Sequence, residues 1–209
     1  MIRLHKDMGE IQLLQDYIGK HQKSCLIFDF DETLMRLNLP WDACLGDLLK
    51  DSDVASSGLI EQYANGEVSL SELQNKLVER FGRGMYTKIC KNNERFETTE
   101  ITGIDIYPEL VEFVRDLHSQ GYTLYLWSSN TKKAVTDALC RVHLEGAFQN
   151  MATRNDVLLL KPEPEGFYFL SNKKDTKREY LMIGNSHNDK RAAAASGIDF
   201  FQIRYFTRE

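Results

Sequence analysis

The chain has 209 residues, of which 42% are hydrophobic and 27% charged, and its formal net charge is −5. This length suits one compact domain or a core domain with a smaller insertion, and this hydrophobic content excludes an intrinsically disordered chain. The mild negative charge and the lack of any apolar run near the roughly 20 residues of a membrane-spanning helix argue against nucleic acid and membrane as partners.

The first predicted elements lead to a pair of carboxylates. Ile11, Leu14 and Ile18 recur at helical spacing, which predicts an amphipathic helix from about residue 8 to 18. The run Cys25-Leu26-Ile27-Phe28 is continuously apolar, as in strands that are buried on both faces of a parallel sheet. It ends at Asp29 and Asp31.

The middle of the chain, from about Leu39 to Phe96, has a helical pattern without a clear strand. Ser69 and Glu72 have the spacing of a capping box and precede apolar residues at helical spacing. Gly66 stands just before this start and is suited to end a preceding helix. We therefore predict an all-helical insertion.

Beyond Gly103, helices and strands alternate. Strands are predicted near residues 123–127, 148–152, 180–183 and 200–203, and helices near 108–119, 132–140, 165–170 and 189–195. Such alternation is typical of β-α-β units and a parallel sheet. The sequence thus predicts a doubly wound α/β core formed by residues 1–35 and 102–209, with a helical cap inserted at residues 36–101.

Polar residues follow four of the apolar runs. In an open parallel sheet, ligands bind beyond the carboxyl ends of the strands, so these residues are expected to meet at one edge. They are Asp29, Asp31 and Thr33; then Ser128, Ser129 and Asn130; then Lys161; and finally Gly184 to Asp189, which includes Asn185.

This set resembles, motif by motif and in order, the haloacid dehalogenase superfamily, in particular its phosphoglycolate-phosphatase-like members with a helical cap. The motifs are D-x-D-x-T at Asp29–Thr33, a strand-ending Ser at Ser128, K-P-x-P at Lys161, and G-N-x-x-x-D from Gly184 to Asp189. Asp31 favours phosphoryl transfer over dehalogenation, since dehalogenases need no second acid at that position.

The resemblance implies a covalent mechanism. Asp29 would attack the phosphorus atom and Asp31 would act as general acid and base. Ser128, Ser129 and Lys161 would bind the phosphate. A Mg²⁺ cofactor would be held by Asp29, the main-chain carbonyl of Asp31, Asn185 and Asp189. The implied reaction is hydrolysis of a small phosphorylated metabolite.

Asn185 departs from the family pattern, which has Asp at that position. A neutral amide oxygen replaces a carboxylate there, so we expect weaker magnesium binding. Asn185 thus leaves one alternative open, a catalytically weakened protein used for binding or regulation. A phosphomutase or phosphotransferase with the same intermediate also stays open, because it would differ from a hydrolase in how well the cap excludes water. The sequence also leaves the choice between monomer and dimer open.

Residues around this site have plainer interpretations as well. Arg36, Trp41 and Tyr63 could line the substrate pocket from the cap, although core packing explains Trp41 equally well. For Arg154 we prefer a structural salt bridge. The four cysteines form no C-x-x-C pair and are typical of inert thiols in a reducing cytoplasm, where we expect the protein to act.

Overall fold

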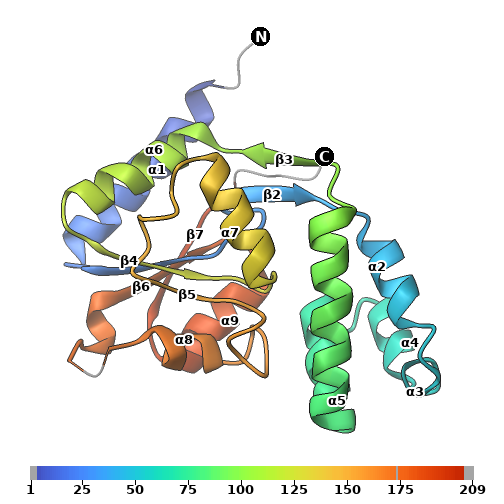
Figure 1. Cartoon of the computed structure of the whole chain (residues 1–209). Helices are drawn as coiled ribbons and strands as arrows, with labels where there is room; N and C mark the ends of the chain where they lie inside the picture. The colour runs from blue at the N-terminus through green and yellow to red at the C-terminus, as the bar shows by residue number, and fades with distance from the viewer. Residues whose placement is uncertain (1–3, 173, 205–209) are drawn as a thin grey trace.

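The computed structural model describes residues 4–172 and 174–204 of the chain, and a five-stranded parallel sheet forms its centre (Figure 1). The strand order is β5-β4-β1-β6-β7, with β1 in the middle and all four of its residues buried. Ile27 of β1 lies opposite Tyr125 of β4 and Met182 of β6. The strands are β1 (Cys25–Phe28), β4 (Thr123–Trp127), β5 (Asn150–Ala152), β6 (Tyr180–Gly184) and β7 (Asp199–Gln202).

Helices cover both faces of this sheet, so the predicted doubly wound α/β fold is confirmed. One face carries α1 (Leu4–Lys20), α6 (Pro108–Ser119) and α7 (Lys132–Arg141). The other carries α8 (Glu165–Leu170) and α9 (His187–Ser196), and a short 3₁₀ helix (Lys177–Glu179) precedes β6. Helix α9 begins two residues before its predicted start because Ser186 caps it.

A helical insertion, which we define as residues 39–102, contains α2 (Trp41–Leu48), α3 (Ser52–Ala55), α4 (Leu59–Ala64) and α5 (Leu70–Thr99). It has an apolar cluster of its own, which includes Leu48, Val54, Leu73, Leu77 and Ile89. The predicted capping box is present at the start of α5. Gly82 interrupts the long helix with φ 72° and ψ −161°, a conformation that only glycine adopts readily.

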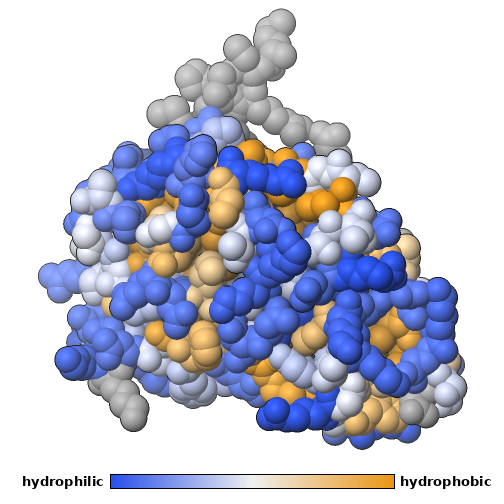
Figure 2. Space-filling model, viewed as in Figure 1, coloured by the Kyte–Doolittle hydropathy of each residue, from blue (hydrophilic) through white to orange (hydrophobic). Residues whose placement is uncertain are grey.

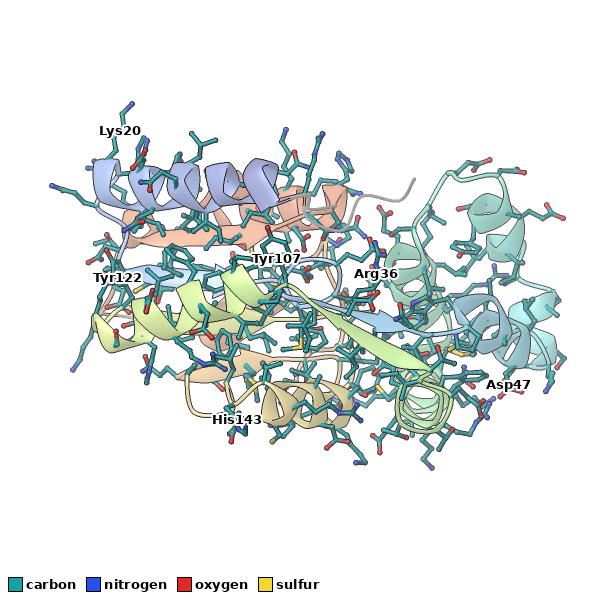
Figure 3. All side chains as sticks on the ribbon, turned by 90° about the horizontal axis from the view of Figure 1, so that it is seen from above. Lys20, Arg36, Asp47, Tyr107, Tyr122 and His143 are labelled. Atoms are coloured by element: carbon teal, nitrogen blue, oxygen red, sulfur yellow. The ribbon has the colours of Figure 1, made fainter. Side chains whose placement is uncertain are left out.

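A two-stranded antiparallel ribbon joins the insertion to the core, and the sequence did not predict it. It pairs β2 (Met35–Asn38) with β3 (Gly103–Ile106), so that Met35 lies opposite Ile106 and Asn38 opposite Gly103. The ribbon is separate from the main sheet, and its strand β2 crosses the predicted boundary at residues 35/36. In Figure 3 it bridges the two parts, with Arg36 labelled on the ribbon and Asp47 on the insertion. The division at residues 35/36 and 101/102 stays a prediction.

The surface is largely polar. Hydrophilic residues cover most of the face seen in Figure 2, and apolar residues form separate small patches there. In the part of the chain that the structure describes, no helix combines the length and apolar character needed to cross a membrane. All four cysteines are free, and three of them are buried.

Candidate active site

Asp29 stands at the point where β1 ends and the chain turns. Its main-chain N–H extends the parallel pairing by donating to the carbonyl of Ile183 (2.8 Å). The carbonyl of Phe30 then accepts from the main-chain N–H groups of Thr33, Leu34 and Met35, and Glu32 adopts a positive φ of 59°. This tight turn brings the Thr33 hydroxyl back to Asp29, where it donates to Oδ2 over 2.8 Å.

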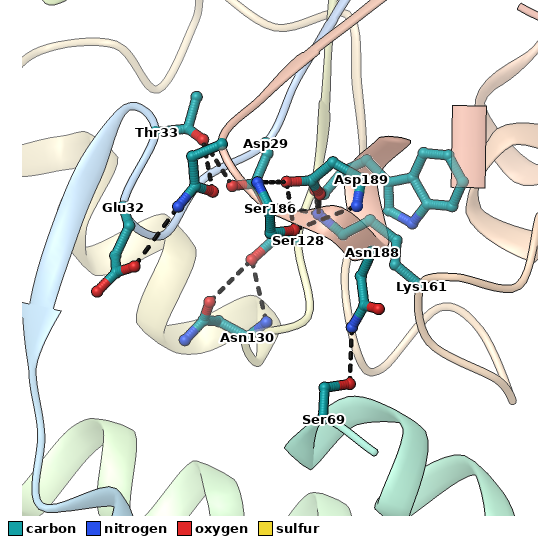
Figure 4. A network of polar contacts seen from close by, with 12 residues as sticks. Asp29, Glu32, Thr33, Ser69, Ser128, Asn130, Lys161, Ser186, Asn188 and Asp189 are labelled. Atoms are coloured by element: carbon teal, nitrogen blue, oxygen red, sulfur yellow. Dashed lines mark hydrogen bonds and ion pairs between the residues drawn. The ribbon is translucent and has the colours of Figure 1, made fainter. Parts of the chain in front are cut away.

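Lys161 lies buried between two carboxylates (Figure 4). Its ammonium donates to Asp29 Oδ1 (2.5 Å), Asp189 Oδ1 (2.6 Å) and the carbonyl of Trp127 (2.9 Å), which uses all three of its protons. Burial lowers the pKa of Lys161, but the charges of Asp189 and Asp29 outweigh this effect and raise the pKa overall. The lysine therefore remains a cation and holds Asp29 in a fixed orientation.

The two aspartates of the first motif both have raised pKa values. Burial and the nearby charge of Asp189 raise the pKa of Asp29 to about 6, although Lys161 opposes this. Burial raises the pKa of Asp31 to about 7; the hydrogen bond from Leu37 opposes this rise, and the charge of Asp29 adds to it. An acid near neutrality can both give and take a proton at ordinary pH.

Asp31 connects the site to the ribbon. Its Oδ1 accepts a hydrogen bond of 2.9 Å from the main-chain N–H of Leu37 in β2. Asp31 also forms a β-bridge with Met35, the first residue of that strand. The position of this carboxylate therefore depends on the strand that leads into the helical insertion.

Asn185 presents its amide oxygen on the same side as Asp29. Its Oδ1 lies 3.2 Å from the Thr33 hydroxyl, which also bonds Asp29 Oδ2, while its Nδ2 faces Glu32 Oε2 at 3.5 Å. Carboxylate and amide oxygens are donors that Mg²⁺ accepts. Among the described residues, no three His, Cys, Asp or Glu side chains converge to hold a metal. A magnesium ion here would thus depend on amide and main-chain oxygens beside Asp29.

Asp189 is fixed at the start of α9. Its Oδ2 accepts from the main-chain N–H (2.9 Å) and the hydroxyl (2.6 Å) of Ser186, and its Oδ1 accepts from Lys161. A Cβ atom at Gly184 would lie 2.7 Å from the Asp189 carboxylate, so glycine is required for this close approach. Because both oxygens are engaged, Asp189 in this arrangement orients Lys161.

The loop after β4 contains the predicted phosphate-binding serines. Ser128 is buried, and its hydroxyl donates to Asn130 Oδ1 and accepts from the main-chain N–H of Asn130, both over 3.0 Å. Ser129 and Asn130, rather than Ser128, line the adjacent cavity. A phosphate oxygen would have to replace Asn130 Oδ1 as the partner of the Ser128 hydroxyl.

A cavity of about 1060 Å³ opens in front of these residues, between the core and the insertion. The core contributes Asp29, Asp31, Ser129, Lys161, Asn185 and Asp189 to its wall, so the structure brings six of the seven predicted site residues to one space, all except Ser128. The insertion and the ribbon contribute the residues predicted from the cap side: Arg36, Trp41 and Tyr63.

Arg154 also lines the cavity, but the salt bridge that we preferred for it is absent from the ion pairs of the described residues. Its guanidinium instead donates to Gln74 Oε1 (2.6 Å) and to the amide oxygen of Asn93 (2.8 Å from Nη2). Both partners belong to α5. Sequence reasoning missed these partners, because polar residues on an amphipathic helix are normally expected to face solvent.

Comparisons with known proteins agree with this fold. Residues 26–203 match the family model described as haloacid dehalogenase-like hydrolase. The chain therefore belongs to that family.

Individual relatives have low sequence identity to this chain. A phosphoglycolate phosphatase of Aliivibrio fischeri is 32% identical over 101 residues, which cover 48% of this chain and 44% of that protein. The match thus spans less than half of this relative's length. A pyrophosphatase PpaX of Bacillus cereus is 26% identical over 78% of this chain and 75% of its own length.

A solved structure described as a predicted phosphoglycolate phosphatase from Haemophilus somnus aligns with a TM-score of 0.61 and 23% identity. The alignment covers 88% of this chain and 86% of that one. This likeness supports the fold.

Proposed function

We propose that this protein is a magnesium-dependent phosphatase that hydrolyses a small phosphomonoester through an aspartyl-phosphate on Asp29. The observation that carries the proposal is the buried contact of 2.5 Å between Asp29 and Lys161 at the wall of the cavity. A carboxylate held beside a permanent cation can approach an anionic phosphate, because the cation offsets the repulsion between the two anions.

Asp29 would act as the nucleophile. One of its oxygens attacks the phosphorus atom and the bond to the leaving alkoxide breaks, so the phosphoryl group becomes an acyl phosphate on Asp29. Water then attacks the same phosphorus atom and releases inorganic phosphate. The loop Ser128–Asn130 would donate hydrogen bonds to the phosphoryl oxygens in both steps, and Lys161 would do so by exchanging one of its three present acceptors for a phosphoryl oxygen.

Asp31 would move the proton. In the protonated form it gives its proton to the leaving oxygen, and as a carboxylate it later takes a proton from the attacking water. A pKa of about 7 suits both roles near neutral pH.

Asp29 Oδ2, Asn185 Oδ1 and the main-chain carbonyl of Asp31 are the oxygens that we propose to hold the magnesium ion. When bound, the ion would add positive charge beside the phosphate. Asp189 was also predicted as a ligand, but its contacts with Lys161 and Ser186 favour a role in orienting Lys161.

The proposed substrate class follows from the site and from the relatives. Phosphoglycolate phosphatase, the name of the relative that matches at 32% identity, denotes a small phosphomonoester as substrate. Beyond the phosphate site the cavity wall combines polar residues, such as Arg36 and Asn38, with apolar ones, such as Leu39 and Trp41.

The variant Asp29→Asn tests the proposal. It keeps the shape of the side chain but removes the nucleophile, so we expect hydrolysis of p-nitrophenyl phosphate with magnesium to fall by roughly 10⁴–10⁶-fold. Circular dichroism should show an intact fold. An active variant would contradict the covalent mechanism, and a wild-type protein without turnover on any phosphomonoester would favour the binding or regulatory alternative.

A further inference from the structure

Four polar side chains of α5 are almost completely buried, and each is directed at a loop of the core. Gln74, Asn75, Asn93 and Glu97 have exposed fractions between 0% and 6%. Asn75 forms two hydrogen bonds of 2.7 Å with the main chain of Leu160, next to Lys161. Gln74 and Asn93 bind Arg154 after β5, and Glu97 binds the loop after β4.

Glu97 makes the contacts that lie nearest to the phosphate-binding loop. Its Oε2 accepts from the main-chain N–H of Thr131 (2.7 Å) and from the hydroxyl of Thr131 (2.5 Å). Its Oε1 accepts from Asn130 Nδ2 over 3.4 Å. Since Asn130 in turn bonds the Ser128 hydroxyl, a continuous chain of hydrogen bonds joins α5 to Ser128.

A gain in stability does not explain well why the carboxylate of Glu97 is buried. Burial raises the pKa of Glu97, and the charge of Arg154 and the hydrogen bonds from Thr131 offset the effect only in part. Removing a carboxylate from water is costly, and apolar side chains of similar volume often stabilise a protein as well or better. Glu97 therefore contributes a defined geometry, because it fixes three donors of one loop at once.

We propose that Glu97 is a positioning residue of the active site, which holds the loop Ser128–Thr131 so that its hydroxyl and N–H groups meet the phosphoryl group on Asp29. The inference rests on the proposed phosphoryl transfer. Because Glu97 belongs to the helical insertion, the loop takes this geometry only while the end of α5 is docked on the core. Docking of the insertion thereby becomes part of the catalytic geometry.

The test compares Glu97→Ala, which removes all three contacts, with Glu97→Gln, whose amide oxygen can still accept from Thr131. Glu94→Ala is the matched control, since Glu94 is exposed and lies three residues earlier on the same helix. For each protein we would measure kcat and KM with p-nitrophenyl phosphate and magnesium. Binding of beryllium fluoride, which mimics a phosphoryl group on the nucleophile, and thermal unfolding would be measured alongside.

For Glu97→Ala we expect kcat to fall by about 10- to 100-fold, because a displaced loop loses contacts that matter most in the transition state. KM should change by less than about threefold, and beryllium fluoride affinity should fall together with kcat. Glu97→Gln should keep kcat closer to wild type than Glu97→Ala does, because its amide oxygen still accepts from Thr131 and only the 3.4 Å contact with Asn130 is lost. Glu94→Ala should match wild type in every measurement.

A folded Glu97→Ala protein with wild-type kcat and beryllium fluoride affinity would overturn the inference, even if it unfolded at a lower temperature. If that variant does not fold, Glu97→Asp decides: the shorter side chain keeps the charge but not the reach, so kcat should fall, and an unchanged kcat contradicts positioning. A wild-type protein without turnover or beryllium fluoride binding would instead refute the proposed phosphoryl transfer.

Discussion

The core of the sheet and the junction between α5 and the core loops are both buried, but they are packed by different means. The sheet excludes water with apolar side chains on both faces, such as Leu26, Leu124 and Met182, none more than 1% exposed. The junction buries polar side chains that form hydrogen bonds between α5 and the core: Gln74, Asn75, Asn93 and Glu97 on the helix, and Arg154 on the core.

The difference has an energetic consequence. Apolar area that leaves water contributes to stability in proportion to its extent, so the sheet is costly to open. A hydrogen bond contributes only about 0.5–1.5 kcal/mol net, because water replaces it when it breaks. The junction therefore specifies one docked geometry while remaining comparatively easy to separate. Because caps of this kind open and close over their sites, we predict a gating motion at the two linkers near Met35 and Thr102.

The largest effect beyond the loss of Asp29 is expected for Asp31→Asn. The amide can neither give nor take the proton, so kcat should fall by about 10²–10⁴-fold. The fall in kcat should be larger for alkyl phosphates than for aryl phosphates, because aryl leaving groups need less protonation. Rates for one substrate of each kind, measured in both proteins, provide the check. Equal losses on both would show that Asp31 acts only through structure or metal binding.

A pair of substitutions tests the comparison directly. Leu124→Ala in the sheet should lower the free energy of unfolding by about 2–5 kcal/mol and leave kcat of the folded protein unchanged. Asn75→Ala at the junction should cost only about 1–3 kcal/mol, but it should lower kcat several-fold because Asn75 fixes the main chain of Leu160, directly before Lys161. Urea unfolding and steady-state kinetics would be measured for both. The opposite pattern would show that the junction serves stability rather than catalysis.

The smallest effect is expected for Asn185→Asp. An added carboxylate should strengthen magnesium binding, but it would face Glu32, whose carboxylate now accepts from the Asn185 amide at 3.5 Å. We therefore expect little change in the single variant and a roughly tenfold lower half-saturating magnesium concentration when Glu32→Gln is added. Activity titrations and calorimetry with magnesium alone would show this. Superimposable curves for wild type and double variant would mean that Asn185 is not a ligand.

The sequence predicted the elements that depend on local pattern. The apolar run Cys25–Phe28 and the capping box at Ser69 have short-range signals, and both are where we expected them. The edge at which Asp29, Lys161 and Asp189 meet follows from the rule for parallel sheets.

The parts that depend on tertiary contacts were missed. The ribbon strand Met35–Asn38 has only four residues, one of them Arg36, and gains its stability from a partner more than sixty positions away. Glu97 reads as a solvated residue of an amphipathic helix, since only the folded core supplies Thr131 as its donor. The break in α5 at Gly82 was also missed, although glycine is unfavourable inside helices.

The register of the ribbon has a consequence for how this chain could change. Asn38 and Gly103 lie directly opposite each other, so the chain enters and leaves the helical insertion at adjacent points. Whatever connects them need only span the distance between neighbouring strands, about 5 Å. Segments of other lengths and folds could therefore be exchanged between these two residues without disturbing the strand order of the sheet, provided that each supplies its own contacts to the loops of the site.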